Sequence, residues 1–142
     1  MTAHAKARLV GSLLLAIALW PIAHRQLVVH QDVNPWKLFG FAMYCTPHDV
    51  VVDLVDRSGA APQRLDPAAF PAPLRESYQR FAARRAVLGR FVAPDALARD
   101  AFAALPELRA LTIAVSVFSL EFGEASVTRH TRLYPFERER DQ

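Results

Sequence analysis

Cys45 and His48 are the two side chains whose types and spacing come nearest to a reactive pair. An imidazole beside a thiol favours the thiolate, which is the nucleophilic form of cysteine. Pro47 stands between them and an apolar run precedes them, which favours a structural thiol over a catalytic one. His30 adds a third donor, but three scattered donors are weaker than any recognised zinc spacing. We therefore predict no catalytic residue, no metal ligand and no cofactor.

The remaining polar residues also lack a recognisable catalytic pattern. The sequence has no glycine-rich phosphate loop, nucleophile elbow or His-Glu metal motif. His130, among arginines on an expected edge strand, is better explained as a solvated residue. Carboxylates near expected strand ends and turns are explained by turn preference, without a pair to assign as acid and base. These are Asp53, Asp56, Asp66, Glu121 and Glu124.

The charge balance is mildly basic, with 17 Lys and Arg against 14 Asp and Glu and a net charge of +3. The densest basic cluster comprises Arg75, Arg80, Arg84, Arg85 and Arg90. At helical spacing most of these side chains would face solvent, and we prefer that interpretation to binding of phosphate or lipid headgroups. The composition therefore predicts no nucleic-acid partner, and the motifs identify no small-molecule substrate.

An uncharged apolar run from Leu9 to Ala23 follows Lys6 and Arg8 and is closed by a histidine and Arg25. At 1.5 Å per residue it reaches about 22 Å, short of the hydrocarbon core of about 30 Å. Three interpretations stay open: an uncleaved signal anchor, a cleaved signal peptide, and a buried helix of a soluble protein. We favour the anchor, because the small residues at 16–18 lie inside the run and those at 21–23 include a misplaced proline.

The predicted anchor occupies residues 1–25, and its lipid contacts are expected from Leu13, Leu14, Leu15, Ile17, Leu19 and Trp20. The basic residues before the run outnumber the single arginine after it. By the positive-inside rule this predicts a cytoplasmic N-terminus and an extracytoplasmic domain. The expected localisation is a single-pass membrane protein.

Residues 26–49 form a juxtamembrane segment that is rich in aromatic side chains between two prolines. It is apolar on more than one side, so it suits contact with lipid or an integral membrane partner as well as with the core. The alternative is a core segment under the sheet. The contact residues expected from the first interpretation are Trp36, Phe39, Phe41, Met43 and Tyr44.

The run from Trp36 to Tyr44, placed directly after a membrane segment, resembles the juxtamembrane aromatic motif of uncharacterised bacterial single-pass membrane proteins. Some of those are similar to companions of multi-span proteins of the vitamin-K-dependent-carboxylase-like type. The resemblance covers about a dozen residues and implies an accessory role beside a larger membrane protein. It transfers no catalytic residue to this chain.

Residues 50–136 are expected to form one α+β domain, and 137–142 a tail. Strand alternation and turn residues predict two β-hairpins, and apolar residues at helical spacing predict a helix pair between them. An antiparallel sheet with both helices on one face follows. A change in alternation predicts a β-bulge near Val117. The expected elements are strands at 50–55, 60–65, 111–122 and 125–136, a linker at 66–73, and helices at 74–91 and 94–105.

Two functions are compatible with this pattern. The preferred one is a non-catalytic accessory or interaction subunit of a larger membrane protein assembly. The alternative is a small extracytoplasmic ligand-binding or catalytic domain, with a pocket between sheet and helices lined by Tyr78, Phe118 and Tyr134.

Overall fold

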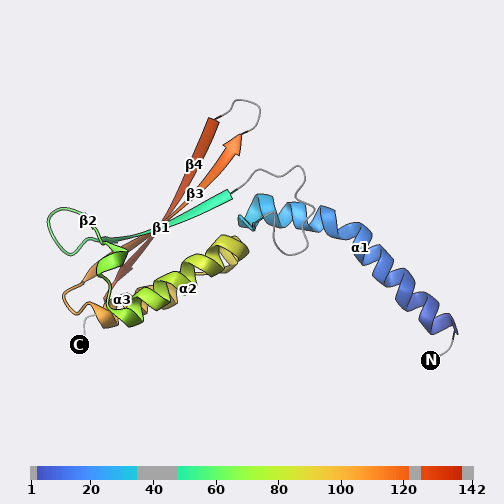
Figure 1. The fold of residues 1–142 in the computed structure, drawn as a ribbon, viewed down its shortest axis with the longest axis horizontal. Helices are drawn as coiled ribbons and strands as arrows, with labels where there is room; N and C mark the ends of the chain where they lie inside the picture. The colour runs from blue at the N-terminus through green and yellow to red at the C-terminus, as the bar shows by residue number, and fades with distance from the viewer. Residues whose placement is uncertain (1–2, 35–47, 122–125, 139–142) are drawn as a thin grey trace.

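A computed structural model of the chain describes residues 3–34, 48–121 and 126–138. The fold is α+β, as predicted: a long N-terminal helix precedes a four-stranded antiparallel sheet with further helices on one face (Figure 1). The elements are α1 (Ala3–Gln31), β1 (His48–Asp56), β2 (Gln63–Arg64), η2 (Pro67–Ala69), α2 (Ala72–Leu88), η3 (Gly89–Phe91), α3 (Asp95–Ala104), β3 (Ala110–Glu121) and β4 (Ser126–Glu137).

The sheet has the order β2-β1-β3-β4, and both hairpins predicted from the sequence are present. The predicted bulge near Val117 is wrong, because the β3–β4 register runs unbroken from the pair Ala110 and Glu137 to the pair Glu121 and Ser126. The alternation changes because the apolar residues after Val117 lie on the opposite face of the sheet from those before it. Leu111, Ile113, Val115 and Val117 point to the helices, whereas Phe118 and Leu120 lie on the face that α2 and α3 leave bare.

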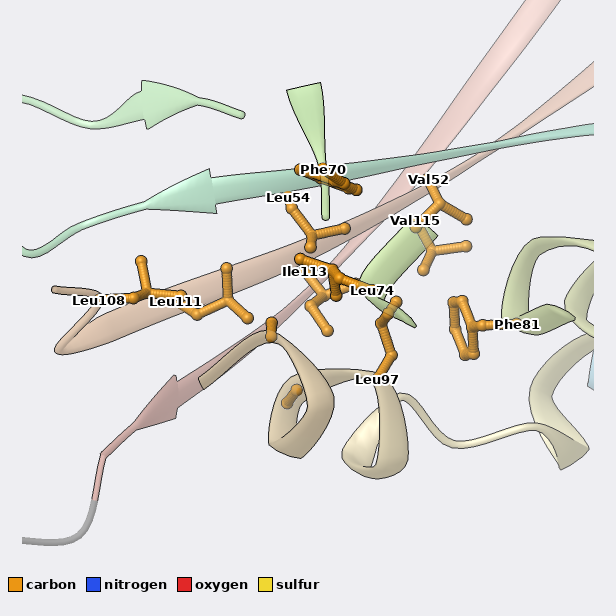
Figure 2. Close-up of a cluster of buried hydrophobic side chains, with 12 residues drawn as sticks. Val52, Leu54, Phe70, Leu74, Phe81, Leu97, Leu108, Leu111, Ile113 and Val115 are labelled. Carbon is orange, nitrogen blue, oxygen red and sulfur yellow. The ribbon is translucent and has the colours of Figure 1, made fainter. Parts of the chain in front are cut away.

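The core lies between one face of the sheet and the helix pair. Figure 2 shows Leu54, Ile113 and Val115 from the strands pointing towards Phe81 and Leu97 from the helices. Two prolines lie at the start of α2, where a missing backbone N–H costs nothing. The segment predicted as a linker thus holds the short helix η2 and the first turn of α2. Burial of this apolar face stabilises the domain.

Helix α1 is longer than the apolar run that predicted it. It has 29 residues, which corresponds to about 43 Å and exceeds the hydrocarbon core of about 30 Å. Residues 26–31 of the expected juxtamembrane segment continue the helix, which ends only where Asp32 adopts the left-handed conformation with φ 54°. Pro21 lies inside the helix, where it removes one backbone hydrogen bond, and Figure 1 shows α1 changing direction along its length.

Tyr78 links α2 to the sheet by donating a hydrogen bond from its hydroxyl to the carbonyl oxygen of Val52 at 2.8 Å. Burial raises the pKa of this phenol, the carboxylate of Asp53 raises it further, and Arg64 lowers it. Because the pKa of Tyr78 is higher in the folded protein than in the unfolded chain, the protonated phenol stabilises the fold fully below the unfolded-state pKa of about 10. This contribution to the free energy of unfolding is lost as the pH rises through the folded-state pKa.

We therefore expect alkaline pH to destabilise the wild-type chain more than the Tyr78→Phe variant. The free energy of unfolding, measured by urea titration of the full chain in detergent, should fall more steeply above about pH 10 in the wild type. The phenylalanine variant cannot ionise at this position, so it serves as the control. Parallel pH profiles for the two proteins would contradict this role of Tyr78.

Candidate functional site

The apolar side chains of α1 are exposed to the surroundings and are not enclosed by the fold. The predicted lipid-contact residues Leu13, Leu14 and Leu15 are 60%, 62% and 60% exposed, and Ile17 and Leu19 are similar, while Trp20 is half-buried. A buried helix of a soluble protein would be covered, yet only 6% of the apolar stretch of α1 is buried. The helix is long and apolar enough to cross a membrane, and a signal sequence meets the same criteria.

The C-terminal end of α1 is joined closely to the sheet domain. Val33 is fully buried, and the backbone N–H of Asn34 donates to the carbonyl of Val87 in α2 at 3.1 Å. The guanidinium of Arg90 donates from Nε to the carboxylate of Asp32 at 2.6 Å. These contacts define the junction, residues 31–34 packed on residues 87–90. It ties the C-terminal end of α1 to α2 and η3.

Gly89 is the residue on which the junction depends most. Its φ of 56° lies in the left-handed region, and a Cβ at this position would come within 1.9 Å of the carbonyl oxygen of Gln31. The backbone of Asp32 would lie 2.5 Å away. Glycine is therefore required both for the backbone conformation and for the close approach of the two chain segments.

A cavity of about 400 Å³ opens beside the junction, between the end of α1, helices α2 and η3, and the helix-facing side of strands β3 and β4. Val29 and Asp32 line it from α1, and Val115, Val117 and Ser119 line it from β3. The remaining lining residues are Arg85, Arg90, His130, Thr131 and Arg132. Because three of them are arginines, we call this site the basic cavity.

Arg85 is the most unusual group in the basic cavity, since its side chain is only 2% exposed. Its guanidinium donates to the carbonyl of Val92 at 3.0 Å and to the hydroxyl of Tyr134 at 3.1 Å, and it lies 5.9 Å from the Tyr134 ring centre. Its buried Nε has no hydrogen-bond partner. In the described part of the chain no carboxylate forms an ion pair with it. Burying a charge without a partner costs several kcal/mol.

Most of the arginine cluster faces solvent, as the helical spacing predicts, and one member does not. Arg75, Arg80, Arg84 and Arg90 are on the surface, but Arg85 is buried and is not on the solvent face. The sequence contains the signal for this placement. Leu74, Phe81 and Arg85 recur at intervals of seven and four, which puts the arginine on the buried stripe of α2.

The aromatic pocket suggested from Tyr78, Phe118 and Tyr134 does not form as one site. Tyr78 and Tyr134 pack against the core, whereas Phe118 lies on the bare face of the sheet, where the guanidinium of Arg129 is 5.5 Å from its ring centre. Alternation of side chains along β3 places Phe118 opposite to Val117. The basic cavity is a different site, lined by three arginines and Asp32 together with valine, histidine and hydroxyl side chains.

The carboxylates near strand ends have structural partners. Asp53 forms an ion pair with Arg64 at 2.5 Å across the β1–β2 hairpin. Asp56 accepts a hydrogen bond from the backbone of Ser58, and Asp66 accepts one from the backbone of residue 68 at the start of η2. The contacts of Asp56 and Asp66 agree with the turn roles inferred from the sequence, whereas Asp53 lies within β1.

Several predicted residues lie outside the described ranges. The partner or lipid contacts Trp36, Phe39, Phe41, Met43 and Tyr44 belong to this group, and so does Cys45. Their roles remain predictions. Within residues 3–34, 48–121 and 126–138, no group of three metal-ligating side chains comes together.

Comparison with known proteins assigns no family. No protein-family model matches the chain, and neither a curated protein nor a solved structure is similar to it. Function must therefore be argued from the geometry of α1, the junction and the surfaces of the domain.

Proposed function

We propose that this chain is a single-pass membrane protein that acts as a non-catalytic accessory subunit of a larger membrane protein assembly. The observation that carries the proposal is the continuity of α1: a helix with exposed apolar side chains leads directly into a buried junction with the domain. An anchor whose C-terminal end packs on its domain favours the presentation of one surface of that domain near the bilayer. A positioned surface is what an assembly subunit requires.

The bare face of the sheet is the surface best suited to a protein partner. Leu120, Val127 and Leu133 are large apolar side chains on this face and are 37%, 63% and 61% exposed. Between them, Arg129 donates to the hydroxyl of Ser116, which is within 2.9 Å of the Thr131 hydroxyl. Mixed apolar and hydrogen-bonding groups are typical of interfaces between separately folded proteins. Exposed apolar groups gathered in one place mark such contacts.

The occupant that this geometry favours is the extracytoplasmic part of a neighbouring integral membrane protein. With α1 in the bilayer, the junction contacts favour a position of the bare face near the membrane surface, within reach of proteins held in the same membrane. Strand β4 is an edge strand, and Pro135 within it lacks a backbone donor, which disfavours uncontrolled strand pairing. The aromatic residues of segment 36–44 are proposed as a second contact, with lipid or the same partner.

The proposed topology has the N-terminus in the cytoplasm. Lys6 and Arg8 precede the apolar run, and Arg25 follows it, so the positive-inside rule favours this orientation. α1 is helical through both candidate cleavage sites and extends to the junction, which supports an uncleaved anchor.

Position-specific photo-cross-linking in native membranes tests the proposal. We expect a photoreactive residue at Leu133, on the bare face, to give one discrete adduct with a polytopic membrane protein. A photoreactive residue at Arg99, exposed on α3 on the other side of the domain, is the matched control and should give none. The native mass of the gently extracted particle should also exceed the 15.8 kDa of the single chain. A bare monomer without an adduct would exclude the subunit role.

A further inference from the structure

The basic cavity beside the junction contains a buried positive charge that the described residues leave incompletely satisfied. Arg85 is bound to a backbone carbonyl and a phenol, both neutral acceptors, and its Nε has no partner. Buried polar groups almost always find a partner, and a buried guanidinium is stabilised best by an anion. An oxyanion in the cavity would supply the acceptor that Nε of Arg85 lacks.

We propose that the basic cavity binds a phosphate group, supplied either by a lipid headgroup or by a soluble phosphorylated compound. Arg85 provides the buried donor, and Arg90 and Arg132 add two further guanidinium groups to the same cavity. Asp32 is the acidic residue of the lining and is already paired with Arg90. The three arginines therefore exceed the carboxylate in formal charge, and planar guanidinium groups match phosphate oxygens in paired hydrogen bonds.

The remaining lining suits the same ligand. Ser119 contributes a hydroxyl and His130 an imidazole, and both can bind phosphate oxygens. Val115 and Val117 form an apolar floor on the sheet, where exclusion of water strengthens charge-assisted hydrogen bonds. A volume of about 400 Å³ is ample for a phosphate and the group that carries it.

The height of the cavity makes a lipid headgroup accessible. Val29 lines the cavity and lies about 9 Å beyond Ala23 along the helix axis. The headgroup layer extends about 5 to 8 Å from the hydrocarbon on each side of a bilayer. If α1 is the anchor proposed above, the cavity opens just above the lipid phosphates. The binding chemistry itself does not depend on that anchoring, so the two proposals can fail separately.

Binding is tested with the full chain, using two probes. Inorganic phosphate is titrated against the chain in a maltoside detergent, which carries no phosphate. In a second arm phosphatidylglycerol is titrated into the same detergent, with retained lipid measured by native mass spectrometry. We expect Arg85→Gln to weaken binding about tenfold or more, since it removes charge-assisted hydrogen bonds. Arg132→Gln, an exposed position, should weaken it several-fold. Arg99→Gln, which carries the same charge change on α3, is the control and should leave binding unchanged.

Each outcome decides the proposal. Saturable, Arg85-dependent binding of inorganic phosphate supports a soluble ligand, and the same dependence seen only with phosphatidylglycerol supports a headgroup. If Arg85→Gln fails to fold, the comparison of Arg132→Gln with Arg99→Gln decides alone. Absence of binding to both probes, or equal loss in Arg132→Gln and Arg99→Gln, overturns the site. A chain that binds phosphate but yields no cross-linked partner would exclude the subunit role and would still support the phosphate site.

Discussion

Replacing Gly89 by alanine is expected to open the junction between α1 and the sheet domain. Its φ of 56° is strained for any residue with a Cβ, at a cost of about 1–3 kcal/mol. The new Cβ would also lie 1.9 Å from the carbonyl oxygen of Gln31, which is backbone and cannot rotate away as a side chain would. The residues around Asp32 must therefore shift, and the contacts of Val33 and Asn34 with the domain are lost.

Hydrogen exchange of the Asn34 amide reports this opening directly, because that N–H donates to Val87 across the junction. We expect much faster exchange in Gly89→Ala, with the amides of the central strands β1 and β3 still protected. Gly59→Ala is the matched control, since a Cβ there meets only one atom, at 3.9 Å, in an exposed turn. Unchanged Asn34 protection in Gly89→Ala would show that the helix and the domain are not joined as described.

Two arginines placed in the middle of α1 are expected to abolish membrane insertion. Leu14 and Ile17 are 62% and 57% exposed and pack against no core. On the insertion scale each exchange of an aliphatic residue for arginine costs about 3–4 kcal/mol at the helix centre, so the pair costs about 6–8 kcal/mol. The fraction of chain recovered with membranes should fall from nearly all to a small remainder. The fold of the sheet domain should be unaffected, because neither side chain contacts it.

The control for this prediction carries the same added charge outside the anchor. Val127→Arg with Leu133→Arg changes two exposed positions of the sheet and should leave membrane recovery as in the wild type. Equal recovery of the Leu14→Arg, Ile17→Arg protein and the wild type, after washing at high salt, would mean that α1 does not hold the chain in the bilayer.

The fold class of the domain and the order of its helices and strands could be predicted, because local sequence patterns and tertiary packing favour the same elements. Val50 to Val55 is β-branched and lies in the centre of the sheet, where that composition packs well. Pro94 and Asp95 lie at the start of α3, where a proline does not interrupt the helix and an acidic residue suits the first turn. In such segments the local preference and the burial pattern favour the same structure, so a single sequence is sufficient.

The structure differs from the sequence-based predictions where one local pattern can have two physical causes. The altered alternation after Val117 resembles a bulge, but apolar residues on a bare face produce the same pattern in an unbroken strand. The change in composition after Arg25 predicts a juxtamembrane segment, yet the helix continues into it and the first residue to leave helical geometry is Asp32. Helix ends depend on capping and on contacts distant in sequence, such as that with Gly89, which no local window contains.

The basic cavity could be predicted only in part. Helical spacing places Arg85 on the buried stripe of α2, so the periodicity of this helix predicts that the arginine is buried. Its neighbours come from α1, η3, β3 and β4, and their meeting depends on the angle at which α1 enters the domain. That angle is set by Asp32, Val33 and Gly89 in three dimensions. Sequence spacing alone carries no information about it.

Extraction of membranes at alkaline pH, followed by intact-mass analysis of the recovered chain, tests the central claim most directly. The claim is that α1 lies in the lipid and remains attached to the domain. We predict that the chain stays in the membrane pellet with the whole of α1 present. Recovery in the supernatant would contradict the claim, and so would a mature chain beginning after Ala18 or Ala23, which would identify α1 as a removed signal sequence.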